Sequence, residues 1–207
     1  MPKETFYHLN VEKRENIEKA LEHELERVSF EKVSISNIVQ EAKIPRGSFY
    51  QYFENKEDAI KYVIEKYRII EIETVKRILV ETKGNIFEAA LKIFDYVTSE
   101  IQGSPRISFY KNVMQELKKN NINLFNNIEE NEEIKEMNHL VDTSILDLKE
   151  KEELKYIMKI ISTIVRTESI NVCTANMTIK DARLNLEKQI EILKRGMIKA
   201  CTIKSIV

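Results

Sequence analysis

Tryptophan is absent from the 207-residue sequence, and glycine, proline and cysteine are scarce, with 4, 3 and 2 residues respectively. Few chain-breaking residues, together with 32% charged and 43% hydrophobic residues, are typical of a mainly helical globular protein. A chain of this length is long enough for one large domain or two small ones. These features predict an all-α fold.

Long apolar runs are absent as well. No uncharged apolar stretch approaches the roughly 18 to 20 residues that span a bilayer. The first ten residues, MPKETFYHLN, lack the apolar core of a signal peptide. The sequence therefore predicts a cytoplasmic protein without a membrane segment.

Motifs for catalysis or metal binding are also absent. Cys173 and Cys201 form no CxxC pair and have no histidine nearby, so both are predicted to be buried, reduced thiols. His8, His23 and His139 are scattered, and there is no glycine-rich phosphate loop, nucleophile motif or metal-ligand cluster. We therefore expect no catalytic residue, no cofactor, no metal site and no enzymatic activity.

The sequence does contain helical periodicity near its N-terminus. Apolar residues recur at spacings of four, four and three at Ile17, Leu21, Leu25 and Val28. This pattern predicts an amphipathic helix over residues 10–28 with a charged outer face.

A shorter helix is predicted after it. Ser34 is a favourable N-cap. Helical spacing is found among the apolar residues that follow, namely Ile35, Ile38, Val39 and Ala42. The helix should end near Lys43, because Pro45 supplies no amide hydrogen and disfavours helical geometry at the residue before it.

A third helix is predicted over residues 46–53. Phe49 and Phe53 are four residues apart and so share one inward face. The other sides then carry Arg46, Ser48, Tyr50, Gln51 and Tyr52.

A long helix should follow this short one. Asn55, with Asp58 three residues later, indicates a capped start, and the apolar pattern continues to about Glu81. Gly84 and Asn85 are the predicted C-terminal stop.

Two helices joined by a four-residue turn and packed by a third form a helix-turn-helix, whose second helix enters the major groove of DNA. The polar and aromatic side chains on the helix over 46–53 are able to contact phosphates and base edges. Residues 1–66 contain 11 Lys and Arg against 13 Asp and Glu. DNA affinity should therefore depend on few phosphate contacts and be sensitive to salt.

Beyond Asn85 the pattern predicts only helices. Two of them span residues 86–99 and 104–119, and a third follows an Asn-rich segment and ends before Asp142. Two long apolar helices follow, over residues 149–173 and from Thr178, where Asp181 is a candidate capping partner. Their apolar surface indicates an interface as well as a core.

The segment VSISNIVQEAKIPRGSFYQYFENKEDAI resembles the N-terminal domain of the tetracycline-repressor (TetR) family of transcriptional regulators. The family pattern is matched in order by Ser34, Ile38 with Val39, Ala42, Gly47-Ser48-Phe49-Tyr50, Tyr52-Phe53 and Lys56-Glu57. The match covers about a quarter of the chain and joins many positions at fixed spacing. One departure is Lys43, because the family usually has glycine in this turn, and a left-handed lysine costs about 1 kcal/mol or more.

The resemblance implies a DNA-binding domain over residues 1–55 and a helical ligand-binding and dimerisation domain over residues 56–207. It implies a homodimer formed by the final two long helices, a double-stranded DNA operator and a small-molecule inducer. Ligand binding would move the fourth helix and change the separation of the recognition helices. We therefore predict a repressor that an inducer releases from a palindromic operator; the alternative is a TetR-like scaffold or activator that works through protein partners without a ligand.

The predicted DNA-binding residues combine the turn, the recognition helix and its flanks. They are Ser34, Lys43, Arg46, Gly47, Ser48, Tyr50, Gln51, Tyr52 and Lys56. Arg46, Ser48, Tyr50 and Gln51 are expected near the bases, and Ser34, Lys43, Tyr52 and Lys56 at phosphates.

The predicted ligand-binding residues are aromatic, methionine and arginine side chains of the C-terminal region that are able to line a cavity. They are Phe94, Phe109, Tyr110, Met114, Phe125, Tyr156 and Arg166. Arg166 and Glu168 interrupt the most apolar helix. They form either an ion pair there or, if Arg166 faces the cavity, a site for an anionic or carbonyl-bearing ligand.

Overall fold

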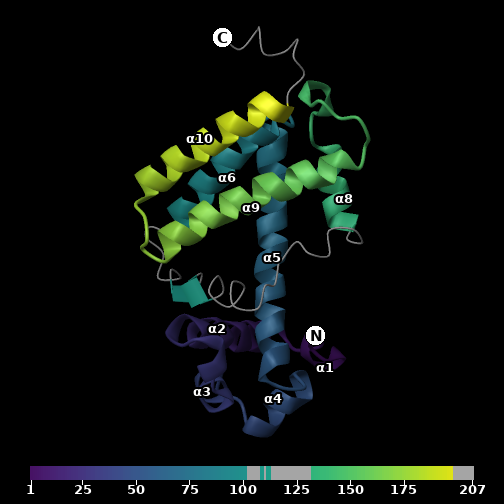
Figure 1. The fold of residues 1–207 in the computed structure, drawn as a ribbon. Coiled ribbons are helices and arrows are strands. Elements are labelled where there is room, and N and C mark those ends of the chain that lie inside the picture. The colour runs from purple at the N-terminus through teal and green to yellow at the C-terminus, as the bar shows by residue number, and fades with distance from the viewer. Residues whose placement is uncertain (102–107, 110, 113–131, 198–207) are drawn as a thin grey trace. The chain divides into compact units, whose positions relative to one another are not determined.

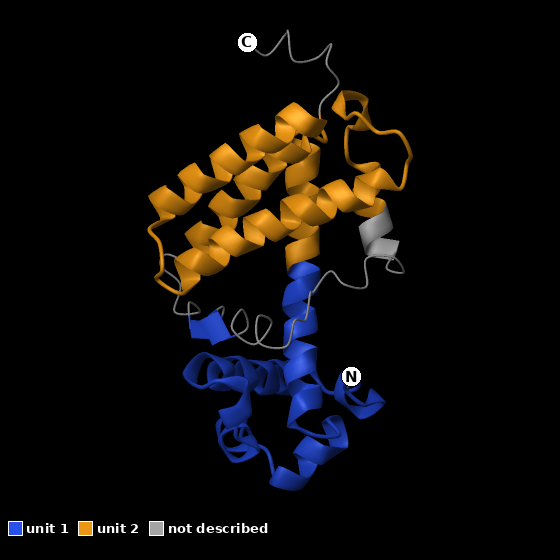
Figure 2. Cartoon of the chain, viewed as in Figure 1, with its two compact units in different colours: residues 1–70, 104–122 blue, residues 71–103, 123–207 orange. Residues whose placement is uncertain are grey.

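The computed structural model describes residues 1–101, 108, 109, 111, 112 and 132–197. Every element in these residues is an α-helix or a short 3-10 helix, which confirms the predicted all-α fold (Figure 1). The chain divides into two compact units (Figure 2): unit 1 comprises Met1–Ile70 and Ser104–Ile122, and unit 2 comprises Glu71–Gly103 and Asn123–Val207. The domain boundary after residue 55 stays a prediction.

Unit 1 contains the elements of the N-terminal third of the chain. They are α1 (Glu4–Tyr7), α2 (Val11–Arg27), the 3-10 helix η1 (Phe30–Lys32), α3 (Ile35–Glu41), α4 (Arg46–Tyr52) and the first part of α5 (Lys56–Glu81). The helices predicted over residues 10–28, 34–43, 46–53 and 55–81 correspond to α2, α3, α4 and α5. Helix α1 was not predicted, because a single turn carries too little periodicity to be seen in the sequence.

A buried glutamate of α2 prepares the start of α3. Oε1 of Glu24 accepts a hydrogen bond from the backbone N–H of Ser34 at 2.9 Å, and Oε2 accepts one from Nη2 of Arg27 at 2.7 Å. Ser34 occupies the predicted N-cap position, but its side chain makes no capping bond. The carboxylate of Glu24 also accepts from Nδ2 of Asn37 in α3 at 3.2 Å, so it ties α2 to the residues that begin α3. A buried carboxylate must be satisfied by nearby donors in this way.

Aromatic rings form the centre of unit 1. Phe6, Phe49 and Phe53 are completely buried, which confirms that Phe49 and Phe53 face inward. The ring of Phe53 lies 5.0 Å from that of Phe6 and 5.3 Å from that of Phe49, measured between centroids. Burial of each such side chain contributes about 1.5–3 kcal/mol, and each ring pair adds about 0.5–1.5 kcal/mol.

Unit 2 contains the rest of α5 and the following described elements. They are α6 (Ile86–Ile101), α8 (Glu132–His139), the 3-10 helix η2 (Thr143–Ile145), α9 (Glu153–Cys173) and α10 (Ile179–Met197). Helices α6, α9 and α10 pack against one another (Figure 1). Their shared core is mainly aliphatic and includes Ile86, Phe94, Ile157, Ile161, Leu186 and Ile190.

Gly84 ends α5 as predicted. Its φ is +79°, in the left-handed region that favours glycine. A Cβ at this position would lie 2.4 Å from the backbone N of Asp142 and 2.6 Å from the carbonyl oxygen of Leu140. Gly84 also accepts a hydrogen bond from the Asp142 N–H at 3.0 Å, so a glycine is required both for the turn and for this close approach.

The start of α10 also agrees with the prediction. Oγ1 of Thr178 accepts a hydrogen bond from the backbone N–H of Asp181 at 3.1 Å and donates one to Oδ2 of Asp181 at 2.7 Å. The helix predicted over residues 104–119 and the Asn-rich segment lie largely outside the described residues. None of the helices in the described part of the chain has the length and apolar character needed to cross a membrane.

Candidate nucleic-acid interface

The turn between α3 and α4 contains a residue in the left-handed conformation, although this residue is a lysine and not the glycine that is usual in the family. Lys43 has a φ of +53°. The backbone N–H of Ile44 then bonds to the carbonyl of Val39 at 3.0 Å, and buried Ile44 anchors the turn. The lysine therefore bears a conformational cost of about 1–2 kcal/mol, and its exposed side chain is available to solvent.

Helix α4 presents polar and aromatic side chains away from the aromatic core. Arg46, Gly47, Tyr50 and Gln51 are exposed, and Ser48 is half-buried. Space is open at Gly47, where an added Cβ would meet no atom within 4 Å. The structure thus places the residues predicted near the bases on the accessible part of one short helix, while their contacts with DNA stay predictions.

Arg46 also links the two helices of the motif. Its Nη1 donates a hydrogen bond to Oγ of Ser36 in α3 at 2.7 Å. The guanidinium has further N–H donors, so this bond orients the side chain and still leaves donors for a second partner.

Tyr52 differs from the prediction. It was expected on the outer sides of α4, but its side chain is only 5% exposed and its ring centroid lies 6.1 Å from that of Phe6. Helix α1, which was not predicted, supplies Phe6 and covers this side of α4. A phosphate contact from Tyr52 stays untested.

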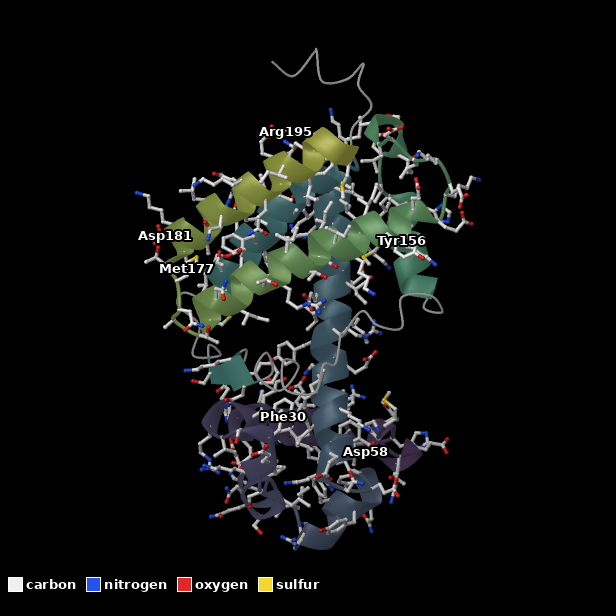
Figure 3. The ribbon with its side chains drawn as sticks, in the orientation of Figure 1. Phe30, Asp58, Tyr156, Met177, Asp181 and Arg195 are labelled. Carbon is white, nitrogen blue, oxygen red and sulfur yellow. The ribbon has the colours of Figure 1, made fainter. Side chains whose placement is uncertain are left out.

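Lys56 stands in the first turn of α5 as predicted, and it already has a partner. Its Nζ donates to the carbonyl oxygen of Glu31 in η1 at 3.0 Å. Oδ1 of Asn55 accepts a hydrogen bond from the backbone N–H of Asp58 at 2.8 Å, which confirms the predicted cap (Figure 3 labels Asp58). The ammonium has three donors, so the bond to Glu31 leaves capacity for a phosphate.

Several acids that make the N-terminal region negative are engaged in ion pairs within unit 1. Nζ of Lys66 lies 2.6 Å from Oε2 of Glu18 and 3.3 Å from Oε1 of Glu22, and the hydroxyl of Tyr62 donates to Oε1 of Glu18 at 2.5 Å. Burial alone would raise the pKa of Glu18, but the hydrogen bonds from Lys66 and Tyr62 leave that pKa below its usual value. These ion pairs join α2 to α5, and they engage Lys66 together with the two acids, so the net charge counted for residues 1–66 is unchanged.

The N-terminal segment is attached to the last turn of α4, a feature that the sequence patterns missed. The backbone N–H of Lys3 donates to the carbonyl of Tyr52 at 2.8 Å, and its Nζ donates to the carbonyl of Tyr50 at 2.8 Å. Oγ1 of Thr5 donates to the carbonyl of Gln51. One general rule could have pointed to this contact: the last carbonyl groups of every helix need hydrogen-bond donors from outside the helix.

The residues predicted to bind a ligand are dispersed. Phe94 belongs to the core of unit 2, whereas Phe109 packs against Tyr67 within unit 1, with 4.4 Å between ring centroids. Tyr156 of α9 is 58% exposed and does not join the core (Figure 3). Tyr110, Met114 and Phe125 are predicted ligand residues that lie outside the described residues or side chains.

Arg166 and Glu168 have different surroundings on α9. Oε1 of Glu168 accepts a hydrogen bond from Nε2 of Gln189 in α10 at 2.7 Å. Burial lowers the pKa of Arg166, and the negative charge of Glu71 opposes this effect. Glu168 thus joins α9 to α10, while Glu71 of α5 is the acid that acts on Arg166.

Cys173 is buried, and burial raises the pKa of its thiol to about 11, as expected for an unreactive structural thiol. Cys201 lies outside the described residues. Among the side chains that the structure describes, no three His, Cys, Asp or Glu residues gather to hold a metal ion.

The C-terminal and N-terminal parts of the chain both match known families. The profile described as "Tetracyclin repressor-like, C-terminal domain" matches residues 85–197, which is more than half of the chain. The profile described as "Bacterial regulatory proteins, tetR family" matches residues 17–63. Proteins of this family are DNA-binding transcription factors, which confirms the prediction that the chain is not an enzyme.

One curated relative and two solved structures place the chain in context. The HTH-type dhaKLM operon transcriptional activator DhaS of Lactococcus lactis subsp. lactis (strain IL1403) is 37% identical over 49 residues, which are 24% of this chain and only 26% of the relative. A TetR-like transcriptional regulator from Rhodococcus sp. RHA1 is 13% identical with a TM-score of 0.54, over 86% of this chain and 93% of the other. A TetR family regulator from Chloroflexus aurantiacus J-10-FL is 21% identical with a TM-score of 0.46, over 96% of this chain and 99% of the other.

The Rhodococcus structure supports the fold alone because its sequence identity is low. The evidence for the family is the long C-terminal match together with the helix-turn-helix match around α3 and α4. The chain therefore belongs to the TetR family of DNA-binding transcriptional regulators.

Proposed function

We propose that the protein is a dimeric repressor that binds a palindromic operator through α4 and is released by a small-molecule inducer. The observation that carries the proposal is the exposed set of Arg46, Tyr50 and Gln51 on a short helix whose opposite face is fixed by buried Phe49 and Phe53. A side chain discriminates between base edges only when the helix that carries it is held rigidly.

The proposed DNA contacts divide into two classes. Arg46, Ser48, Tyr50 and Gln51 read base edges, with Gly47 allowing close approach of the backbone. Ser34, Lys43, Tyr52 and Lys56 hold phosphates, which sets the register but carries no sequence information.

We propose that α9 and α10 form the dimer. Four large apolar side chains on these helices are exposed in the single chain, namely Tyr156, Ile160, Leu184 and Ile192. Exposed apolar surface on two neighbouring helices is a feature of oligomer interfaces. A two-fold dimer would present two α4 helices to half-sites about 34–36 Å apart.

The inducer would act by binding preferentially to a state in which the recognition helices no longer match that spacing. We propose that its contacts include Phe94 and Arg166 of unit 2. Tyr110, Met114 and Phe125 stay candidates. Phe109 packs within unit 1 and exposed Tyr156 is assigned to the dimer surface, so neither is proposed to join Phe94 in one site. If Arg166 contacts the inducer, an anionic or carbonyl-bearing ligand is expected. Such a regulator would act in the cytoplasm, where its operator is.

The second candidate is an activator or scaffold that works through protein partners without a ligand. It is favoured by the relative from Lactococcus lactis, which is named a transcriptional activator, although the match covers only 26% of that protein. A transcription assay with the operator upstream of a reporter distinguishes the two functions. Repression relieved by a small molecule supports the first, and stimulated transcription supports the second.

The first test is selection of bound sequences from a random DNA pool by the purified full-length protein at about 0.15 M salt. Enrichment of an inverted repeat is the expected result, because a two-fold dimer reads a symmetric site. Enrichment of a single, unrepeated half-site would contradict the symmetric dimer, and no enriched motif would contradict operator binding by the free protein.

The enriched sequence then allows the two classes of contact to be separated. Gln51→Ala should change the preference among operators at one position, by about 1–3 kcal/mol. Lys56→Ala should weaken binding about equally on all sequences. Equal loss on every sequence for both variants would show that Gln51 does not read a base.

A further inference from the structure

The last turn of α4 is held by the segment that precedes α2. A helix leaves its final four carbonyl groups without partners inside the helix. In α4, the carbonyl of Tyr50 accepts from Nζ of Lys3 at 2.8 Å, and the carbonyl of Tyr52 accepts from the backbone N–H of Lys3 at 2.8 Å. The carbonyl of Gln51 accepts from the hydroxyl of Thr5. Three consecutive carbonyls of the recognition helix are thus satisfied by two residues about fifty positions away in sequence.

Phe6 fastens this segment to the core of unit 1. Its side chain is completely buried, and its ring lies 5.0 Å from that of Phe53 and 5.0 Å from that of Tyr62, between centroids. Burial of a phenylalanine supplies enough free energy to order the few residues around it. Lys3 and Thr5 are therefore presented to α4 by an anchored backbone.

Helix α4 needs such support. It has only seven residues, and helices of that length do not persist through their own hydrogen bonds. The carbonyls held by Lys3 and Thr5 belong to Tyr50 and Gln51, whose side chains are exposed and proposed to approach the bases. A shift of the last turn would move both of these side chains.

We propose that residues 3–6 form a clamp that sets the position of α4 for base recognition, with Lys3 and Thr5 as positioning residues. The proposal rests on the proposed function, because it assumes that α4 reads the operator. It extends the DNA-reading unit beyond the helix-turn-helix, to a segment that precedes the matched residues 17–63.

The side chain of Lys3 is also able to contact DNA directly, and the test must separate this role from positioning. A lysine next to the recognition helix is able to bind a phosphate directly, and loss of one phosphate contact lowers the slope of log affinity against log salt by about 0.9. A positioning residue leaves that slope unchanged. Thr5 is uncharged, so its effect is free of this ambiguity.

The test uses the full-length protein with Thr5→Val, Thr5→Ser and Lys3→Met. Affinity is measured for the selected operator, for an operator altered at the bases assigned to Gln51, and for unrelated DNA. Backbone hydrogen exchange of α4 is measured without DNA. Thermal unfolding checks that each variant is folded.

The expected result for Thr5→Val is faster exchange in α4 and an operator affinity lower by roughly threefold to tenfold. Affinity for unrelated DNA should be unchanged, so discrimination against the altered operator falls. Thr5→Ser keeps the hydroxyl and should restore both the exchange rates and the affinity. Lys3→Met should behave as Thr5→Val does, with the salt slope of the native protein.

Native exchange and native discrimination in Thr5→Val would overturn the clamp. A lower salt slope with native exchange in Lys3→Met would overturn the positioning action of Lys3 and make it a phosphate ligand. If the native protein binds no operator, the proposed function fails. The exchange measurement on α4 still decides whether residues 3–6 hold that helix.

Discussion

Unit 1 and unit 2 each bury a helical glutamate almost completely, and the surroundings of the two carboxylates differ. Glu24 of unit 1 is 3% exposed and accepts hydrogen bonds from the Ser34 backbone and from the Arg27 side chain. Glu168 of unit 2 is 4% exposed and accepts a hydrogen bond from Gln189 at 2.7 Å. The first carboxylate ties α2 to the start of α3, whereas the second joins the long helices α9 and α10 at one point.

The wider packing shows the same contrast. In unit 1, rings and directional hydrogen bonds hold short helices that have little stability of their own. In unit 2, long helices pack through a mainly aliphatic core, which is less directional and tolerates substitution of similar volume. Directional contacts therefore lie in the unit that carries α4, the helix proposed to contact DNA bases.

The largest expected effect comes from removing one buried ring in each unit. Phe53→Ala and Phe94→Ala both truncate fully buried side chains and should lower the free energy of unfolding by about 3–5 kcal/mol. Phe53→Ala should also abolish operator binding at a temperature where Phe94→Ala still binds. The reason is that Phe53 helps to orient α4, whereas Phe94 lies in the core of unit 2. Denaturant unfolding and operator titration measure the two effects, and equal loss of DNA binding in both variants would contradict the contrast.

The two buried glutamates give the next largest effect. Glu24→Ala should cost roughly 2–4 kcal/mol, because the Ser34 N–H and its other donors lose their acceptor. Glu168→Ala should cost only about 1–2 kcal/mol, through the lost bond to Gln189. Glu24→Gln and Glu168→Gln are matched controls, because glutamine keeps the shape of the side chain and removes its charge. Denaturant unfolding measures all four variants. A cost for Glu168→Ala equal to or above that for Glu24→Ala would reverse the comparison.

Acid should weaken unit 1 through Glu18. The pKa of Glu18 is lowered in the folded state, so its contribution is fully present above the unfolded pKa and is lost as pH falls through the folded pKa. Glu18→Gln should remove about 1 kcal/mol of stability near neutral pH and flatten the decline below about pH 4.5, the ordinary pKa of this carboxyl. Unfolding titrations of both proteins over the acidic range test this, and parallel pH profiles would count against the Glu18–Lys66 pair.

The smallest effect is expected at two lysines that share the same left-handed backbone conformation. Lys43 of unit 1 and Lys83 of unit 2 have φ values of +53° and +52°. Lys43→Gly and Lys83→Gly should each raise the free energy of unfolding by roughly 0.5–1 kcal/mol, since glycine enters the left-handed region without strain. Only Lys43→Gly should lower the salt slope of operator binding, by about 0.9. A change of slope in Lys83→Gly, or none in Lys43→Gly, would remove Lys43 from the phosphate contacts.

The helices of unit 1 were largely predictable because their signals are local. The spacing of Ile17, Leu21 and Leu25 reflects one face of α2, and Pro45 limits α3 through its own ring. The inward direction of Phe49 and Phe53 followed from their spacing of four. The fixed spacing of these signals was enough to indicate the family.

Features that depend on partners distant in sequence were not predictable in this way. The burial of Tyr52 depends on Phe6. Ser34 makes no side-chain capping bond, and its backbone N–H donates to Glu24, ten residues earlier in the chain. Tyr156 was a candidate for a ligand cavity, yet its side chain is largely exposed on α9. Periodicity identifies an apolar side chain but does not say which surface covers it.

The sequence by itself determined the all-α class, the helix-turn-helix and the residues available on α4, because each depends on interactions within a few positions of the chain. Only the tertiary structure decided how α4 is held, through Lys3, Thr5 and Phe6. The physical reason is that hydrogen bonds to helix ends and contacts between buried rings depend on distance in space, and folding alone brings residues 3–6 to the last turn of α4.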